Sequence, residues 1–257
     1  MFDWIIAFQS LLILFLMALL TWIVSLVKRD VSIVDSIWSL FFLAAMWVYY
    51  AHPSANGPRS TLALVLIGMW SFRLCAYLTW RNWGQPEDRR YQAIRRTNEP
   101  HFTFKSLAII FLFQAVLAWL ISLPILPVLK SSQALGLLDI LGIALFLFGL
   151  VFESLADWQM SHFKAHTDSK NLIMDQGLWR YTRHPTYFGE FCVWWGFYFL
   201  ALSADASPWV LFAPLLMSFL LIKLSGVPLL EKDLIERRPA YREYQKRTNC
   251  FFPGLPK

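Results

Sequence analysis

The stretch WIIAFQSLLILFLMALLTWIVSLV, residues 4–27, contains no charged residue and exceeds the roughly 20 residues that a helix needs to cross a bilayer. Similar apolar runs lie near residues 31–51, 60–80, 104–129, 135–156, 188–204 and 208–225. The last two are shorter and share the turn sequence SADASP at 203–208, which predicts a tight helical hairpin. Because 57% of the 257 residues are hydrophobic and 16% are charged, we expect an all-α membrane protein with about seven transmembrane helices.

The positive charges are divided unequally between alternate loops. Twenty of the 23 Lys and Arg residues lie in segments 28–29, 81–105, 157–187 and 223–257, whereas Arg59 and Lys130 lie in the other loops and Arg73 lies inside a span. Since cytosolic loops carry the excess of Lys and Arg, the pattern predicts an N-terminus outside and a C-terminus in the cytosol. The net charge of +6 fits this topology and attraction to anionic lipid headgroups, and does not imply nucleic acid.

Composition gives little indication of a metal centre or a soluble nucleotide fold. Cys75, Cys192 and Cys250 are odd in number and far apart, which indicates neither a disulfide framework nor a zinc site. His162 and His166 are i,i+4 neighbours without flanking acidic or Cys ligands, so no metal is expected. The sequence has no GxGxxG or P-loop pattern, and no repeat or linker interrupts it, so residues 1–257 are read as one membrane domain.

Three cytosolic segments, 81–103, 157–187 and 226–257, are longer than ordinary connections and rich in Arg, Tyr and Trp. The central one contains GLWRYTRHPTYFGE at 177–190, in which Pro185 suits the first turn of a helix. Arg180, Arg183 and His184 surround that helix start, where unpaired N–H groups favour an anion. Glu190 follows in an apolar run, and ionisable groups at membrane depth are functional candidates. The alternative is a basic loop that only initiates the sixth helix.

A second group lies at the cytosolic end of the fifth span. At about 100° per residue, Glu153, Asp157 and Lys164 fall at roughly 0°, 40° and 20° on one helix face. That face can line a polar cleft. The alternative is a solvated stripe, although Glu153 directly follows the apolar sequence LGIALFLFGLVF.

The second and third spans carry Asp35 and Arg73. Ser32 and Asp35 have the spacing of a capping box, so capping alone could explain Asp35. Arg73 lies within LVLIGMWSFRLCAYLTW and needs a partner or a water-filled cavity, which an Asp35–Arg73 pair would provide. The alternative is that Arg73 extends to the cytosolic interface.

The tail combines Glu231 with RRPAYREYQKRTNCFFPGLP at 237–256. Its alternation of Arg and Tyr suits either an interfacial amphipathic helix or a lid over a negatively charged ligand.

Together, ADWQMSHFK at 156–164, GLWRYTRHPTYFGE at 177–190 and GVPLLEKDLIERRPAYREYQKRTNCFFP at 226–253 resemble the bacterial branch of the steroid 5-alpha reductase family, from about residue 30 onward. The RHPxYxG core is also shared with sterol reductases and isoprenylcysteine carboxyl methyltransferases. The resemblance implies NADPH held in a seven-helix bundle that is open to the cytosol, and reduction of an enone double bond. The implied cofactor pocket is lined by Asp157, Lys164, Arg183, Tyr187, Glu190, Tyr244 and Arg247, and the family often has Asn where this chain has Thr186.

The resemblance also implies a catalytic pair. In the steroid reductases a Glu on the second helix and a Tyr on the third bind the substrate ketone. Asp35 takes the place of the Glu, and alignment on Arg73 and Tyr77 puts Trp70 where the Tyr would stand. An indole donates a hydrogen bond but cannot pass on a proton as a phenol can.

We therefore expect an NADPH-dependent reductase of an apolar enone, steroid-like or another lipid, whose cofactor side lies mainly in residues 150–257. The expected location is the bacterial inner membrane, as a monomer with its cofactor site facing the cytosol and with lipids as its partners. Buried Asp35 would be protonated and donate to the substrate carbonyl. One alternative is an S-adenosylmethionine-dependent membrane methyltransferase, and a second is a non-enzymatic assembly or transport protein.

Overall fold

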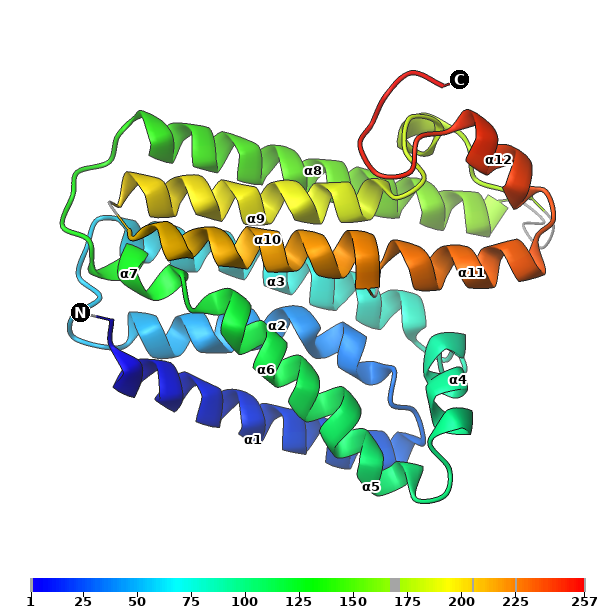
Figure 1. The fold of residues 1–257 in the computed structure, drawn as a ribbon, viewed down its shortest axis with the longest axis horizontal. Helices are drawn as coiled ribbons and strands as arrows, with labels where there is room; N and C mark the ends of the chain where they lie inside the picture. The colour runs from blue at the N-terminus through cyan, green and yellow to red at the C-terminus, as the bar shows by residue number, and fades with distance from the viewer. Residues whose placement is uncertain (1, 167–171, 205, 225, 257) are drawn as a thin grey trace. The chain divides into compact units, whose positions relative to one another are not determined.

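The computed structural model describes residues 2–166, 172–204, 206–224 and 226–256, and within these ranges it contains helices and no strand (Figure 1). The chain is thus all-α, as predicted. Its contacts divide it into two units: residues 1–136 with 201–213, and residues 137–200 with 214–257. The single-domain reading stays a prediction.

The first unit is organised around α2, which contacts α1, α3, α6 and α7. Ser39 Oγ of α2 donates to the carbonyl of Ser71 on α3 at 2.8 Å, and Ser71 Oγ donates back to the carbonyl of Ser39 at 2.9 Å. These reciprocal bonds hold the two helices together. The helices of this unit are α1 (Trp4–Lys28), α2 (Ile33–Tyr50), α3 (Arg59–Asn82), α4 (Arg89–Thr97), α5 (Phe102–Ser106), the π-helix η1 (Leu107–Leu112), α6 (Phe113–Ser122), α7 (Ile125–Lys130) and the short η3 (Pro208–Leu211).

Helix α1 shows why lipid must surround this unit. Small and polar residues such as Ala7, Ser10 and Ala18 form its buried face. Large apolar residues cover the opposite face, where Leu12 is 60% exposed and Val27 is 83% exposed. A helix that is apolar on its exposed side is stable in hydrocarbon but not in water.

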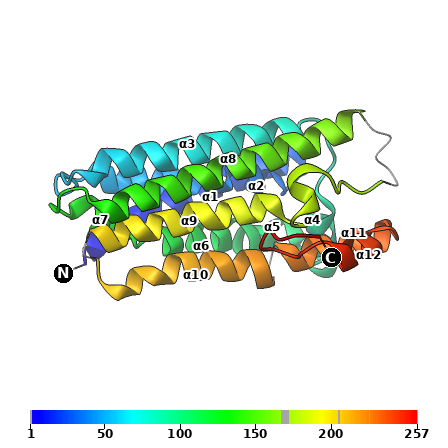
Figure 2. The same cartoon turned by 90° about the horizontal axis from the view of Figure 1, so that it is seen from above.

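The second unit contains α8 (Leu137–His166), η2 (Gly177–Arg180), α9 (Pro185–Ser203), α10 (Phe212–Phe219), the π-helix η4 (Leu220–Leu224), α11 (Val227–Arg237) and α12 (Tyr241–Arg247), with the ends of α9 and α10 crossing the boundary. Helix α9 begins at Pro185, as predicted. Helices α9 and α10 lie side by side in Figures 1 and 2, and Trp195 Nε1 donates to Ser218 Oγ at 3.3 Å between them. The predicted helical hairpin is therefore present.

Helices α8 and α9 approach each other closely at two glycine pairs. A Cβ added at Gly142 would lie 2.7 Å from the carbonyl oxygen of Gly196, and one at Gly149 would lie 2.5 Å from that of Gly189. A Cβ at Gly189 would in turn lie 2.7 Å from Cβ of Glu153. The glycine of the RHPxYxG sequence is thus required by packing against α8, because only a residue without Cβ permits this backbone approach.

Replacing Gly149 by alanine should lower the free energy of unfolding by about 1–3 kcal/mol, because the added methyl meets backbone atoms that cannot move aside. Chemical denaturation in detergent measures the difference. Gly68→Ala in α3 is the matched control, since a Cβ there meets nothing within 4 Å. We expect the control to be neutral or stabilising, and an equal loss in both variants would contradict the close-packing account.

Among the residues that the structure describes, five segments are long and apolar enough to cross a membrane: Trp4–Lys28, Ile33–Tyr50, Arg59–Asn82, Phe102–Lys130 and Leu137–His166. The fourth is composite, since it comprises α5, η1, α6 and α7, and Pro124 separates the last two helices. Pro208–Leu224 is a shorter apolar segment, and α9 is not among the five candidates.

Candidate functional site

The carboxylate of Glu231 on α11 is the centre of a polar cluster in the second unit, which we call the Glu231 cluster: Arg183, His184, Glu231, Tyr241 and Gln245. Arg183 Nε lies 2.8 Å from Oε1 of Glu231, and His184 Nε2 lies 2.9 Å from the same oxygen. Gln245 Nε2 donates to Oε2 at 2.8 Å, and the Tyr241 hydroxyl donates to Oε1 at 3.3 Å. The side chains of Arg183 and Glu231 are only 10% and 14% exposed. The carboxylate is therefore surrounded by donors and shielded from water.

The tail folds back onto the GLWRYTRHPTYFGE segment through further hydrogen bonds. Arg183 Nη1 donates to the carbonyls of Gln245 and Thr248, at 3.1 and 2.7 Å. Thr182 Oγ1 donates to the carbonyl of Phe251 at 2.8 Å, and the Tyr244 hydroxyl donates to the carbonyl of Trp179. These contacts anchor the tail as a cover over the central segment within this unit.

The donors around Glu231 control its ionisation. Burial alone would raise the pKa of this carboxyl group, but hydrogen bonds from His184 and Arg183 outweigh burial and lower the pKa from 4.5 to about 2. Burial raises the pKa of Tyr241, and the charge of Glu231 raises it further. At neutral pH the cluster therefore contains a carboxylate and a protonated phenol.

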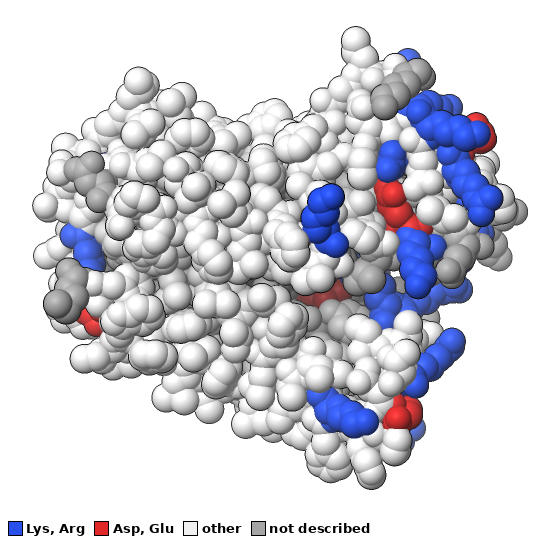
Figure 3. Space-filling model, in the orientation of Figure 1, with Lys and Arg blue, Asp and Glu red and all other residues white. Residues whose placement is uncertain are grey.

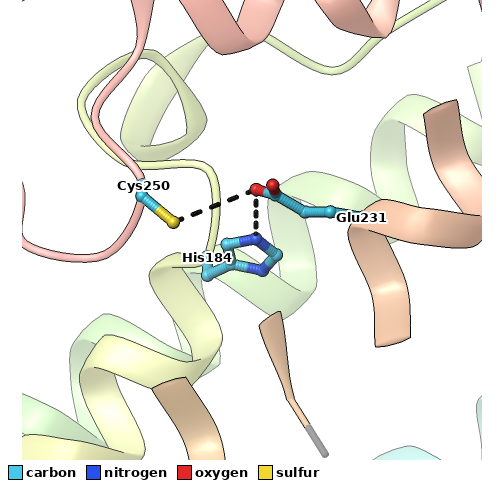
Figure 4. Close-up of side chains that lie close together, drawn as sticks. All are labelled: His184, Glu231 and Cys250. Atoms are coloured by element: carbon cyan, nitrogen blue, oxygen red, sulfur yellow. Dashed lines mark hydrogen bonds and ion pairs between the residues drawn. The ribbon is translucent and has the colours of Figure 1, made fainter. Parts of the chain in front are cut away.

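Cys250 extends the cluster toward a possible metal-ligand set. One donor atom each from His184, Glu231 and Cys250 lies within 4.8 Å of the others, and Figure 4 shows the Cys250 thiol and the His184 ring both facing the carboxylate. The guanidinium of Arg183 already pairs with that carboxylate. The positive charge of Arg183 would repel a metal cation at this position. The carboxylate of Glu231 therefore serves as the partner of Arg183 in an ion pair. The expectation of no metal site stays a prediction.

This geometry changes the roles expected for three residues. We expected Arg183 to reach a ligand phosphate, but Glu231 and two tail carbonyls occupy its guanidinium. Tyr244 is 2% exposed and holds the turn at Trp179. Arg247 pairs with Asp175. In the structure these side chains tie the tail to the unit, a role that sequence spacing did not indicate because their partners are 48–72 residues away.

Among the other residues of the expected cofactor pocket, the acidic side chains are buried and two of the basic ones are exposed. Glu153 and Asp157 on α8 and Glu190 on α9 are buried, at 2%, 8% and 8% exposure. Lys164 and Arg180 are exposed. Tyr187 stacks on His184 at 5.6 Å with an interplanar angle of 7°. The second unit thus combines three buried carboxylates with exposed basic groups.

In the first unit, Asp35 contacts α4 rather than Arg73. Arg90 Nη2 donates to Oδ2 of Asp35 at 2.8 Å, and the Tyr91 hydroxyl donates to Oδ1 at 2.5 Å. Gln114 Nε2 donates to the Tyr91 hydroxyl at 3.2 Å. Tyr91 is 7% exposed. Burial raises its pKa well above the ordinary value, and the charge of Asp35 raises it further. Tyr91 therefore keeps its proton at neutral pH.

Two expectations for Asp35 are therefore wrong. Ser32 makes no side-chain capping bond, and the N–H of Ser32 is bound by Asp30 instead, so no capping box forms. The Asp35–Arg73 pair does not form either, because charge-assisted bonds to Arg90 and the phenol of Tyr91 use both oxygens. Asp35 is an acceptor here, and the donor beside it is Tyr91. Trp70 is fully buried and packs edge-to-face on Phe42 at 5.5 Å.

Tyr91, Arg90 and Gln114 were missed as site residues. The length and Arg/Tyr content of segment 81–103 indicated that it builds something at the cytosolic face, but no local spacing links it to Asp35, 55 and 56 residues earlier. The expected catalytic residues Asp35, Trp70 and Arg73 all lie in the first unit, and the expected cofactor residues all lie in the second.

The apolar helices define a multi-pass membrane protein. The chain belongs to the family described as "Protein of unknown function (DUF1295)", which it matches over residues 21–248. It is also similar to an uncharacterized protein of Schizosaccharomyces pombe, at 27% identity over 96% of this chain and 79% of that protein. No solved structure matches it.

Proposed function

We propose that this protein is a membrane-embedded, NADPH-dependent reductase of the carbon–carbon double bond in an apolar enone. The observation that carries the proposal is the pair formed by Asp35 and the protonated Tyr91, a buried phenol held 2.5 Å from a carboxylate. The resemblance of residues 156–164, 177–190 and 226–253 to the steroid 5-alpha reductase family supports the same chemistry. A lipid enone, steroid-like or otherwise, is the substrate class.

We also propose seven spans, with α9 and Pro208–Leu224 as the sixth and seventh. The N-terminus then lies outside and the tail in the cytosol of a bacterial cell, as the distribution of Lys and Arg indicates. Within the second unit, Figure 3 shows basic side chains gathered over α11 and α12, the segments that this topology assigns to the cytosol. The white helix bodies contact lipid.

The donor set of the second unit fits NADPH. Exposed Lys164 and Arg180 suit its phosphates, and the buried carboxylates of Glu153, Asp157 and Glu190 suit ribose hydroxyls and the amide N–H groups of nicotinamide. Arg183 does not serve here, because Glu231 and tail carbonyls already bind it. S-adenosylmethionine has ribose hydroxyls but no phosphate, so it would not use the basic groups.

When bound, NADPH supplies the hydride that adds to the β-carbon of the enone. In this proposal the single hydroxyl proton of Tyr91, which Asp35 accepts in the structure, turns to the carbonyl oxygen of the bound enone, which gains negative charge as the hydride arrives. Asp35, bound by Arg90, holds the phenol in place before the enone binds. The high pKa of Tyr91 makes the phenol a hydrogen-bond donor rather than the final acid. The proton on the α-carbon therefore comes from water.

NADPH should bind at least about tenfold more tightly than NADH, because the 2′-phosphate adds charge for basic side chains. Thermal stabilisation of the purified protein in detergent at one salt concentration measures both affinities. Lys164→Ala and Arg180→Ala should reduce the preference, while the substitution Arg242→Ala, at an exposed position of α12, is the matched control. Stabilisation by S-adenosylmethionine alone would favour the methyltransferase, and a response to neither cofactor would favour a non-enzymatic protein.

A further inference from the structure

A cleft of about 650 Å³ opens in the first unit where α1 ends and α2 begins. It lies between these helix ends, the end of α3 and the following loop, residues 83–87. Its size is in the range of sites that hold small organic molecules. Asp35, Arg90 and Tyr91 are not among its lining residues, so it is distinct from the proposed catalytic pair.

The part of this cleft that α1 and α2 line is apolar and lies on candidate membrane spans. Leu20 and Val24 of α1 face it together with Ile33 and Ile37 of α2. Leu20 is 62% exposed and Val24 is 47% exposed. These side chains offer a hydrocarbon-like surface on which an acyl chain can lie.

The mouth carries two basic side chains. Lys28 Nζ lies 5.4 Å from the ring centre of Trp83, a cation–π contact that orients the ammonium group. Arg29 is the C-cap of α1 and has a left-handed backbone conformation, with φ 54°. Its N–H donates to the carbonyl of Ser25, and this bond fixes the backbone that carries the guanidinium. Within the described ranges neither side chain forms an ion pair. Both cations are available to an anion.

The two carboxylates at the mouth offset only part of this positive charge. Asp30 accepts from the N–H of Ser32 at 2.8 Å and from its hydroxyl at 2.5 Å. Glu87 accepts from the N–H of Val31 at 2.9 Å and pairs with Arg95 at 2.7 Å. Arg95 neutralises Glu87, whereas Asp30 keeps its charge, so Lys28, Arg29 and Asp30 together leave a net positive charge at the mouth.

We propose that this cleft binds an anionic phospholipid, with an acyl chain along the surface of Leu20, Val24, Ile33 and Ile37 and the headgroup phosphate on Lys28 and Arg29. Trp80 and Trp83, 66% and 74% exposed, suit the level of the membrane interface, where aromatic side chains concentrate. The apolar surface suits the acyl chain of such a lipid, and the two cations at the mouth suit its phosphate. The proposal does not depend on the reductase chemistry.

The test uses delipidated full-length protein in neutral detergent, titrated with phosphatidylglycerol or phosphatidylcholine while the melting temperature is followed. Phosphatidylglycerol should stabilise the protein more than phosphatidylcholine does. The double variant Lys28→Ala/Arg29→Ala should raise the half-saturating phosphatidylglycerol concentration roughly 30-fold, since each cation contributes about 1 kcal/mol. The control Arg89→Ala/Arg96→Ala removes the same charge from exposed positions on α4 and should respond like the wild type.

A charge-neutral variant tests the apolar half of the site. Val24→Trp adds a large side chain to the apolar part of the cleft, so it should also weaken phosphatidylglycerol stabilisation while leaving both cations in place. Inorganic phosphate at the same concentration should have no effect, because it lacks the acyl chain. Stabilisation by phosphate alone, equal responses to the two lipids, or a wild-type response in both cleft variants would overturn the proposal.

Discussion

Replacing Glu231 by alanine should lower the free energy of unfolding by about 3–5 kcal/mol and release the tail from the central segment. The substitution leaves the nearly buried Arg183 guanidinium without its carboxylate and removes the acceptor of His184 and Gln245. Removing one partner of a buried ion pair costs this much because the other charge stays desolvated. Chemical denaturation in detergent measures the loss, and limited proteolysis reports release of residues 238–256.

Glu243→Ala is the matched control for this prediction. Glu243 lies on α12 in an exposed i,i+3 pair with Lys246, with both side chains more than 70% exposed. Exposed pairs contribute little, so we expect almost no change in stability and an unchanged proteolysis pattern. A similar small effect of Glu231→Ala would show that the cluster does not hold the tail.

The same carboxylate predicts a pH dependence whose sign is fixed by its low pKa. Because the folded-state pKa of about 2 lies below the ordinary 4.5, the stabilisation is fully present above about pH 4.5 and is lost as the pH falls toward 2. The variant Glu231→Gln lacks the ionisable carboxyl group, so its stability does not depend on this titration. The stability difference between wild type and Glu231→Gln should therefore shrink by up to about 3 kcal/mol between pH 5 and pH 2.

The sequence was sufficient for the helices because their signals are local. Apolar runs mark the five candidate spans, and Pro185 marks the start of α9. The shared face of Glu153, Asp157 and Lys164 indicates that the fifth helix extends beyond its apolar run, and α8 does continue past Lys164. Each of these signals depends on residues within one or two helical turns.

The site contacts could not be predicted because they join distant segments. The neighbouring sequence predicts only that Arg183 is a cation beside the start of a helix. Its partner, Glu231, is on α11, 48 residues later. Asp35 likewise has capping spacing with Ser32, but the charged donor Arg90 is the stronger partner, and tertiary contacts override a local preference in such a case. Glu231 was noted in the tail, but nothing in its neighbourhood indicated which cation it binds.

Replacing Tyr91 by phenylalanine should reduce turnover of an accepted enone by about 10²–10³-fold, or roughly 3–4 kcal/mol, if Tyr91 stabilises the oxygen of the transition state. The fold should survive, because Asp35 keeps its bond to Arg90. As a purely structural bond, the Tyr91 hydroxyl would contribute only about 1 kcal/mol to stability, and turnover would barely change. Single-turnover rates with saturating NADPH measure the effect. Tyr50→Phe at the other end of α2 is the control.

Asp35→Ala and Asp35→Asn separate orientation from charge. Arg90 retains Asp88 at 3.0 Å, so neither variant leaves that guanidinium without an acceptor. Asp35→Ala should lower turnover about as far as Tyr91→Phe, since the phenol loses the group that holds it. Asp35→Asn offers a carbonyl acceptor of the same size and should fall between the alanine variant and wild type. NADPH affinity, measured by thermal shift, should be unchanged in all three variants. If they bind NADPH and reduce the enone at nearly the wild-type rate, the reductase proposal stands but Asp35 and Tyr91 are only structural; if wild type neither binds NADPH nor reduces enones, the reductase proposal itself fails.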